Sequence, residues 1–449
     1  MKQDSIKHKE KYGLFTAIAM IVGVCIGSGI FFKSDNILVA AGGSIFLGVV
    51  VFVIAAMAII FGGITVGELA SRTSNPGGIV TYADEFLGSR TACGFGWFQT
   101  FVYYPTLIAV VSWVVGVYTC ILLNLPGRLE TQILIGYGFT IICFLFNTLS
   151  AKAGGIFQNC TTIIKMIPLL FLAVFGFIYG DPLSGFSNVS LQSFKGSSWI
   201  AAIGPIAFSF DGWIVSTSVA HEIKDSKRNM RKALIIAPLF ILVLYVIYFV
   251  GISSYIGPEN VMALGDEHVA LAASNLFGPV FAKAVTIFVI ISVMGTVNGL
   301  ILGFIRMPYS MALRRGMMPF SNKLSAMDKK LDMPVNSSLF AFSLVSLWML
   351  VHYITAKYDF LPNSDISEIS IAMSYLLYIA LYYQVYKMYK NKEITSPLRG
   401  LVFPALAGLG SLFILSGGLQ NSLFIYYAGF CLLVIILSQI YYNRKEKSS

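Results

Sequence analysis

Charged residues are scarce in this sequence. Only 12% of its 449 residues are Asp, Glu, Lys or Arg, whereas 57% are hydrophobic. An ordinary globular protein carries about 25% charged residues, which its water-exposed surface requires. The shortage therefore excludes a typical water-soluble protein and indicates an integral membrane protein.

Disulfide frameworks and flexible linkers are also missing. The six cysteines fall in or at the ends of apolar segments without metal-ligand or disulfide spacing, so we interpret them as small packing residues. No stretch rich in Pro, Gly and Ser separates soluble domains. No cleavable signal sequence is visible, so we expect the first apolar segment to remain in place. The sequence predicts one membrane domain that needs no metal or other cofactor.

Long apolar runs dominate the chain instead. A bilayer span needs ~20 mostly apolar residues, and the hydropathy pattern predicts an all-α protein with twelve transmembrane helices. They lie near residues 14–40, 44–67, 93–123, 132–150, 156–179, 200–221, 233–255, 281–312, 337–356, 367–386, 401–418 and 423–442.

The formal net charge of +10 is distributed unevenly between alternate loops. With twelve spans, 24 of the 31 Lys and Arg residues lie on one side, and Lys33 is among the few assigned to the other. The positive-inside rule makes the basic side cytoplasmic. We therefore expect both termini in the cytoplasm and the protein in the cell membrane, and we attribute the basic charge to membrane orientation rather than to a nucleic-acid partner.

Two of the predicted spans are interrupted. Gly27-Ser28-Gly29 interrupts the first, and the run Phe208-Ser209-Phe210-Asp211-Gly212-Trp213 interrupts the sixth. The glycines alone are also compatible with a simple kink or helix-packing motif. However, irregular backbone at membrane depth is tolerated only where it is buried in protein or lines a cavity, and a second interruption five spans later favours a binding site.

The spacing of the interruptions predicts an inverted repeat. Five is an odd number, so the second group of five spans enters the membrane from the opposite side, with a broken first helix in each half. The expected units are a tail (1–11), a five-helix repeat (12–179), its inverted copy (198–388), two additional helices (400–443) and a second tail (444–449).

Broken helices of this kind suit a ligand with two opposite charges. The N–H groups that begin the resumed first helix suit a carboxylate. The carbonyl groups that end the half-helix before Phe208 suit an ammonium group. A small molecule with both charges is an α-amino acid.

Several longer motifs resemble those of a known superfamily. They are GVCIGSGIF (23–31), GELASRTSNPGGIVTYADEFLG (67–88), FSFDGW (208–213), HEIKDSKRNMRKA (221–233) and GTVNGLILGFIRMPYSMALRRGMMP (295–319). The chain resembles the amino acid, polyamine and organocation superfamily, most closely its L-type amino acid transporter branch and the bacterial alanine-serine-cysteine exchangers. The resemblance implies a twelve-helix fold with alternating access and sodium-independent exchange of amino acids.

The resemblance also implies site residues. The carboxylate would be held by Gly27, Ser28 and Gly29, and the amine by main-chain carbonyl groups around Ile26, Phe208 and Asp211, with Phe208 as the gating aromatic. Lys165, in the fifth span, would replace a coupling sodium ion beside the first interruption. The alternatives for Lys165 are a proton-carrying lysine or one paired with a carboxylate.

Other polar residues allow two interpretations each. Asp211 is either an N-cap of the second half of the sixth span or a pocket carboxylate for cationic substrates. Glu68, Arg72, Glu222 and Arg306 form either an inner gate or a solvated surface.

Aromatic residues are assigned mostly to the membrane interfaces. Those expected in the interface belts are Trp97, Tyr103, Tyr104, Tyr382 and Tyr383. Tyr245 and Tyr248, in the seventh span, are weaker candidates for contact with the site.

Transport fits these features better than catalysis or a channel. The histidines His221, His268 and His352 lack catalytic partners in the sequence. We predict exchange of small neutral L-amino acids (Ala, Ser, Cys, Gly), with a proton-coupled amino acid symporter or a cationic amino acid/polyamine antiporter as alternatives. Membrane lipids are the other expected partners. No disulfide-linked heavy chain is expected, because the loop 124–131 has no cysteine.

Overall fold

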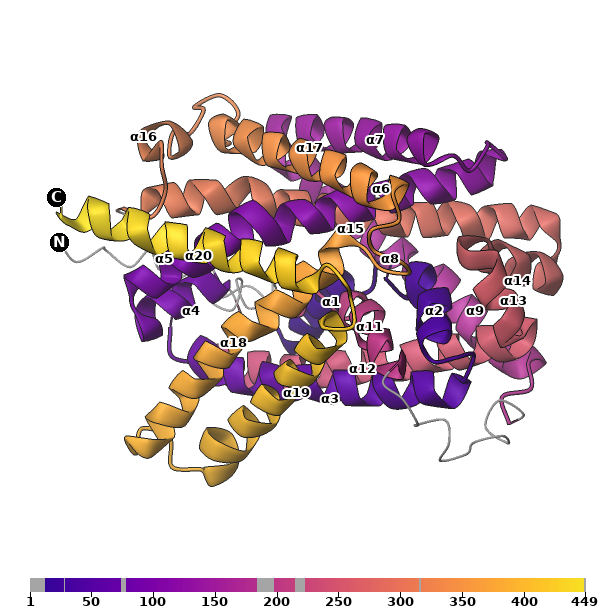
Figure 1. The fold of residues 1–449 in the computed structure, drawn as a ribbon, viewed down its shortest axis with the longest axis horizontal. Helices are drawn as coiled ribbons and strands as arrows, with labels where there is room; N and C mark the ends of the chain where they lie inside the picture. Colours follow the sequence, from indigo (N-terminus) through magenta and orange to yellow (C-terminus); the bar gives the residue numbers. More distant parts are fainter. Residues whose placement is uncertain are drawn as a thin grey trace.

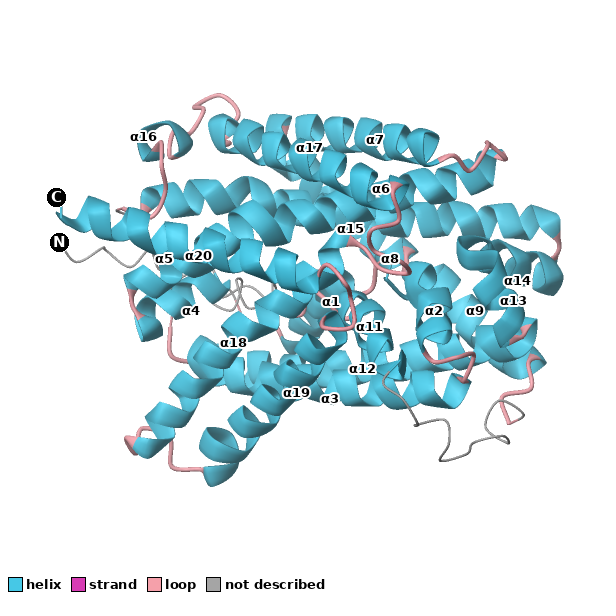
Figure 2. Ribbon diagram, in the orientation of Figure 1, coloured by secondary structure: helices cyan, strands magenta, loops and turns pink. Residues whose placement is uncertain are grey.

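Helices make up almost all of the part of the chain that the structure describes. The computed structural model describes residues 13–27, 29–73, 78–183, 198–214, 223–314 and 316–447. Figure 2 shows helices joined by loops, and the described residues form no sheet, only one isolated bridge between Asp328 and Met333. The predicted all-α class is therefore confirmed for this part of the chain.

The helices follow the apolar runs of the sequence. The first half contains α1 (Leu14–Cys25), α2 (Gly29–Ala40), α3 (Ile45–Ala70), α4 (Gly78–Leu87), α5 (Ser89–Phe98), the π-helical turn η1 (Gln99–Tyr103), α6 (Tyr104–Leu123), α7 (Leu129–Leu149), α8 (Ala151–Ile164) and α9 (Met166–Tyr179). The second half contains η3 (Ser198–Ala202), α11 (Ile203–Ser209), α12 (Ser226–Ile256), α13 (Pro258–Leu264), η5 (Gly265–Glu267), α14 (His268–Phe277), α15 (Pro279–Leu313), α16 (Ser321–Leu324), α17 (Val335–Lys357), α18 (Ile366–Lys390), η6 (Leu398–Val402), α19 (Phe403–Gly418) and α20 (Phe424–Lys447).

Ten helical segments of the described chain are long and apolar enough to cross a membrane. They coincide with ten of the twelve predicted spans, so the chain is a multi-pass membrane protein. The other two predicted spans, 14–40 and 200–221, contain only shorter apolar helices, Leu14–Cys25 and Trp199–Ser209. These are the two spans in which the sequence contains interruptions.

The short helices α1, α2 and α11 lie in the middle of the bundle (Figure 1). Within this centre α2 packs on α11, and α1 packs on the long helix α12. The short helices α4 and α16 lie at one end of the molecule, and α13 and α14 lie at the other (Figure 1). The described parts of both interruptions therefore lie inside the bundle and away from its outer surface.

Candidate functional site

The first predicted interruption falls between two described helices. α1 ends at Cys25, Ile26 is extended with ψ of 102°, and α2 begins at Gly29. A Cβ atom on Gly27 would come within 2.4 Å of the Thr296 hydroxyl oxygen, and one on Gly29 within 2.5 Å of the Ser209 Cα atom. The Ser209 main chain therefore requires glycine at position 29, whereas the neighbour at position 27 is a side-chain hydroxyl group. Ser28, also predicted for the site, lies outside the described residues.

The second interruption follows α11. The helix ends at Ser209, and residues 210–214 form turns in which Gly212 has a φ of +93°. A Cβ atom on Gly212 would lie 2.5 Å from Val24 Cγ1 in α1, so this glycine meets both a conformational and a steric requirement. Residues 215–222, including the possible inner-gate residue Glu222, lie outside the described part of the chain.

One tyrosine joins the two interruptions. The Tyr245 hydroxyl group, on α12, lies 3.2 Å from the Cys25 carbonyl oxygen and 3.0 Å from the Ser209 carbonyl oxygen. These are the carbonyl groups at the ends of α1 and α11. A hydroxyl has one proton to donate, so the two carbonyl groups share this donor. Tyr248 does not reach the breaks and packs edge-on against Phe31.

A small cavity of about 60 Å³ lies where the interruptions meet. Gly27, Gly29, Phe208 and Asp211 line it, together with Tyr104 from α6. The structure therefore brings these four predicted site residues together around one space. Ile26 is fully buried beside it in the first interruption and is not among the lining residues.

Asp211 has a partner that sequence reasoning missed. The Tyr103 hydroxyl donates to Asp211 Oδ2 at 2.5 Å. Tyr103 ends the π-helical turn η1, an irregularity often found at functional sites. The predicted cap by Asp211 involves the half-helix after residue 214, which lies outside the described residues.

The assignment of Tyr103, Tyr104 and Tyr382 to the membrane interfaces is wrong. Their exposed fractions are 1%, 7% and 2%, because the helices that carry them lie mostly inside the bundle. Tyr383, by contrast, is exposed, and Trp97 is partly buried with its indole N–H donated to the Met317 carbonyl group.

Lys165 lies beside the first interruption. It occupies the single-residue junction between α8 and α9, is fully buried, and donates its ammonium group to the carbonyl oxygen of Gly23 in the last turns of α1. Gly23 lines the same cavity. The Lys165 amine therefore contacts the main chain just before the break.

An ion cluster lies on the other side of Phe208 and was not predicted. Lys33 donates to Asp365 at 2.7 Å and to Glu368 at 2.5 Å, and its ammonium group lies 5.1 Å from the centroid of the Phe208 ring. The placement of Lys33 among external loop cations is wrong, because α2 continues to Ala40 and buries it. Glu368 also lines a cavity of about 330 Å³.

The predicted inner-gate residues have other partners. Glu68 accepts from Arg231 at 2.5 Å, whereas Arg72 and Arg306 donate to the main-chain carbonyl groups of Glu393 and Leu302. Sequence reasoning did not propose Arg231 as the partner of Glu68.

A second ion pair lies at the same end of the bundle. Arg314 contacts Asp84 at 3.1 Å. Burial lowers the pKa of Arg314, and the carboxylates of Asp84 and Glu85 oppose that shift. The guanidinium group therefore remains charged and joins α4 to the end of α15.

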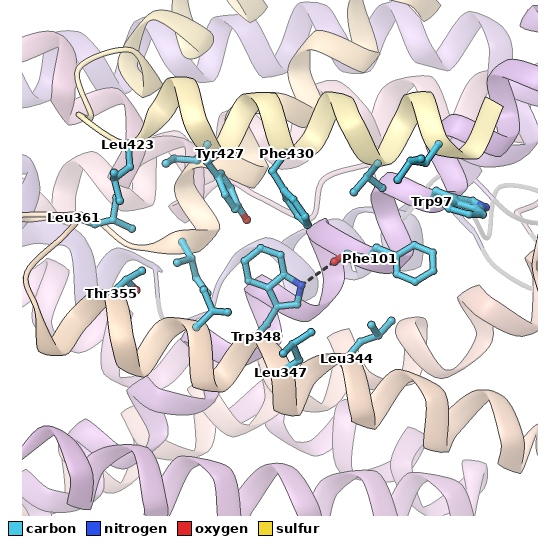
Figure 3. A pocket seen from close by; sticks show the side chains of 15 residues that line it. Trp97, Phe101, Leu344, Leu347, Trp348, Thr355, Leu361, Leu423, Tyr427 and Phe430 are labelled. Carbon is cyan, nitrogen blue, oxygen red and sulfur yellow. Dashed lines mark hydrogen bonds between the residues drawn. The ribbon is translucent and has the colours of Figure 1, made fainter. Parts of the chain in front are cut away.

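A larger cavity of about 530 Å³ lies between α5, η1, α17, α18 and α20 (Figure 3). Its lining is almost entirely apolar, and the Trp348 indole N–H is already donated to the Phe101 carbonyl group at 2.7 Å. Such a space offers little to a zwitterion. Within the described residues, no three His, Cys, Asp or Glu side chains are grouped as metal ligands.

Comparison with known proteins gives consistent matches over nearly the whole chain. A family model described as amino acid permease matches residues 12–445. The serine/threonine exchanger SteT of Bacillus subtilis (strain 168) is 28% identical over 419 residues, covering 92% of this chain and 91% of the exchanger.

Two animal transporters match at lower identity. The human cystine/glutamate transporter is 24% identical over 432 residues, which cover 94% of this chain and 83% of the transporter. The b(0,+)-type amino acid transporter 1 of Rattus norvegicus is 24% identical over 446 residues, covering 97% and 87% respectively. These relatives are transporters and not enzymes.

Proposed function

The chain belongs to the amino acid permease family, and we propose that it exchanges small neutral L-amino acids across the cell membrane without sodium. The predicted resemblance to the amino acid, polyamine and organocation superfamily is confirmed by this membership and by the transporter relatives. The observation that carries the proposal is the meeting of two helix interruptions around one small cavity, with the buried amine of Lys165 beside it.

The proposed grip on the substrate uses main-chain atoms. The first N–H groups of α2 have no partner within the helix and carry the positive end of its dipole, so they suit the α-carboxylate. We assign this role to Gly27, Ser28 and Gly29. The carbonyl groups around Ile26, Phe208 and Asp211 would accept from the α-ammonium group.

Small substrates fit the proposed pocket best. A cavity of about 60 Å³, narrowed by Phe208 and Tyr104, leaves little room for a long side chain. Alanine, serine, cysteine and glycine are the proposed substrates. The serine/threonine exchanger among the relatives is compatible with this size class.

Lys165 is proposed to replace a coupling cation. Its ammonium group already satisfies the Gly23 carbonyl oxygen, which a sodium ion would otherwise coordinate. A cation that is covalently attached does not dissociate, so the cycle would not need a sodium gradient.

The proposed architecture has twelve spans in a five-plus-five inverted repeat. Residues 12–179 and 198–388 would form the two halves, each beginning with a broken helix, and residues 400–443 the two additional helices. We place both termini in the cytoplasm by the distribution of basic loops. We expect the protein to act without a disulfide-linked heavy chain.

The test is uptake of labelled L-alanine or L-serine into proteoliposomes. We expect rapid uptake only when the vesicles contain unlabelled amino acid, with no effect of a sodium gradient. Equal uptake into empty vesicles, or uptake driven by a pH gradient alone, would indicate symport and contradict exchange.

A second candidate is antiport of cationic amino acids or polyamines. The Asp211 carboxylate lines the cavity and favours this candidate. Its hydrogen bond with Tyr103 opposes it, because one carboxylate oxygen is already occupied. Competition of arginine and putrescine against labelled alanine distinguishes the two, and a neutral exchanger prefers unlabelled alanine.

A further inference from the structure

A strongly basic pocket lies at the end of the bundle that carries most of the positive charge. Its volume is about 600 Å³, and five basic side chains line it: Arg72, Arg228, Arg231, Lys232 and Arg399. Glu68 is the one acidic residue in this lining. The pocket is separate from the proposed substrate cavity and shares no lining residue with it.

Little of this positive charge is neutralised. Glu68 pairs with Arg231, and within the described chain the other four basic side chains have no acidic partner within 4.0 Å. Arg72 donates instead to a main-chain carbonyl group. The buried Nε atom of Arg231 has no hydrogen-bond partner among the described residues, so this guanidinium group keeps an unused donor. Confining several like charges is unfavourable unless an anion joins them.

The pocket lies where several membrane-length helices begin or end. Arg72 follows the end of α3, Arg228 and Lys232 lie in the first two turns of α12, and Arg399 lies in η6, which continues into α19. Each is within a few residues of the end of a membrane-length helix. The basic groups therefore surround the boundary between the apolar core and water.

Exposed apolar side chains lie next to the basic ones. Leu398, Leu401 and Val402 of η6 are 58%, 43% and 37% exposed, on the same turn as Arg399. A free phosphate ion would gain nothing from these residues, whereas the acyl chains of a phospholipid would cover them. The combination of a basic pocket and an apolar flank favours an amphiphilic anion.

We propose that this pocket binds the phosphate group of an anionic membrane phospholipid, with the acyl chains along η6. Arginine guanidinium groups bind phosphate oxygens through paired hydrogen bonds, and basic pockets between membrane helices are suited to anionic headgroups. Arg228 and Arg399 come from different helices, so one headgroup joins α12 to η6 and α19.

The test is binding of phosphatidylglycerol to the purified full-length protein, measured by native mass spectrometry. Phosphatidylcholine and inorganic phosphate are the comparison ligands. We expect clear preference for phosphatidylglycerol, and we expect Arg228→Gln combined with Arg399→Gln to weaken it about 10- to 30-fold. The matched control, Lys329→Gln with Lys330→Gln, removes the same charge from an exposed loop at the same end and should bind as the unchanged protein does.

Three results would overturn the proposal. They are equal binding of phosphatidylglycerol and phosphatidylcholine, equal binding by the double variant and its control, and phosphate binding as strong as lipid binding. Thermal unfolding shows whether the double variant is folded. If it is not, Arg399→Gln alone, at an exposed position, should lower affinity about fivefold, and an unchanged affinity there would equally contradict the proposal.

Discussion

At the scale of the residue, the proposed site depends on two glycines at which a larger side chain would collide with neighbouring atoms. Gly29 faces the Ser209 Cα atom, and Gly27 faces the Thr296 hydroxyl group. A side-chain hydroxyl can rotate away, but a Cα atom cannot move without its helix. Gly29 is therefore the more restricted position of the two.

Gly29→Ala is expected to reduce exchange at least tenfold and to lower the thermal unfolding midpoint. The added methyl group would lie 2.5 Å from the Ser209 Cα atom and force α2 away from α11. The matched control is Gly138→Ala in α7, where a Cβ atom meets nothing within 4 Å. There alanine should be neutral or slightly stabilising. Normal exchange by Gly29→Ala would contradict the close contact.

Lys165→Ala is expected to slow exchange, or to change its asymmetry between the two sides, without preventing folding. The reason is that the Gly23 carbonyl group loses the donor that Lys165 provides. The exposed Lys390→Ala is the control. Proteoliposomes that exchange alanine at the unchanged rate and asymmetry would show that Lys165 has no coupling role.

Tyr245→Phe is expected to raise the KM for alanine several-fold while the protein remains folded. The substitution removes the donor shared by the Cys25 and Ser209 carbonyl groups, at a cost of about 1 kcal/mol in stability. Tyr383→Phe, at an exposed position, is the control. Identical KM values for the two variants would mean that the Tyr245 hydroxyl does not position the interruptions.

At the scale of the element, a buried charge contact joins α2 to the start of α18. Lys33 is the only basic partner that the described residues provide for both Asp365 and Glu368 in ion pairs. Removing Lys33 would leave the two buried carboxylates without a cation, whereas removing one carboxylate would leave Lys33 paired with the other. Breaking a buried pair at one partner typically costs about 3–5 kcal/mol.

Lys33→Met is therefore expected to destabilise the protein more than Glu368→Gln does. Thermal unfolding of the purified variants measures the difference. The control is Lys357→Met, which breaks a pair with Glu130 between half-exposed side chains and should have little effect. Equal midpoints for Lys33→Met and Lys357→Met would contradict a structural role for the cluster.

Local features of the sequence predicted the elements but not their contacts. Apolar runs of membrane length coincide with ten helical segments, and the glycines at 27 and 29 indicated the first interruption. An apolar run and a pair of glycines can each be recognised within one short stretch of sequence. The contacts of Lys33 with Glu368 and of Tyr103 with Asp211 join residues 335 and 108 positions apart. No periodicity or spacing connects such residues, so these partners required the packed structure.

At the scale of the whole molecule, charged contacts lie on both sides of the central cavity. Lys33 and its carboxylates lie beyond Phe208, and the Glu68–Arg231 and Arg314–Asp84 pairs lie at the opposite end. A substrate in the cavity would be enclosed by both groups. In our account, alternating access breaks one group of contacts while the other stays formed.

The most direct measurement is a structure of the purified protein with bound L-alanine. Our account predicts the α-carboxylate at the first N–H groups of α2 and the α-ammonium group near the carbonyl groups of Ile26 and Phe208. Alanine bound elsewhere, or held by side chains away from the two interruptions, would contradict it.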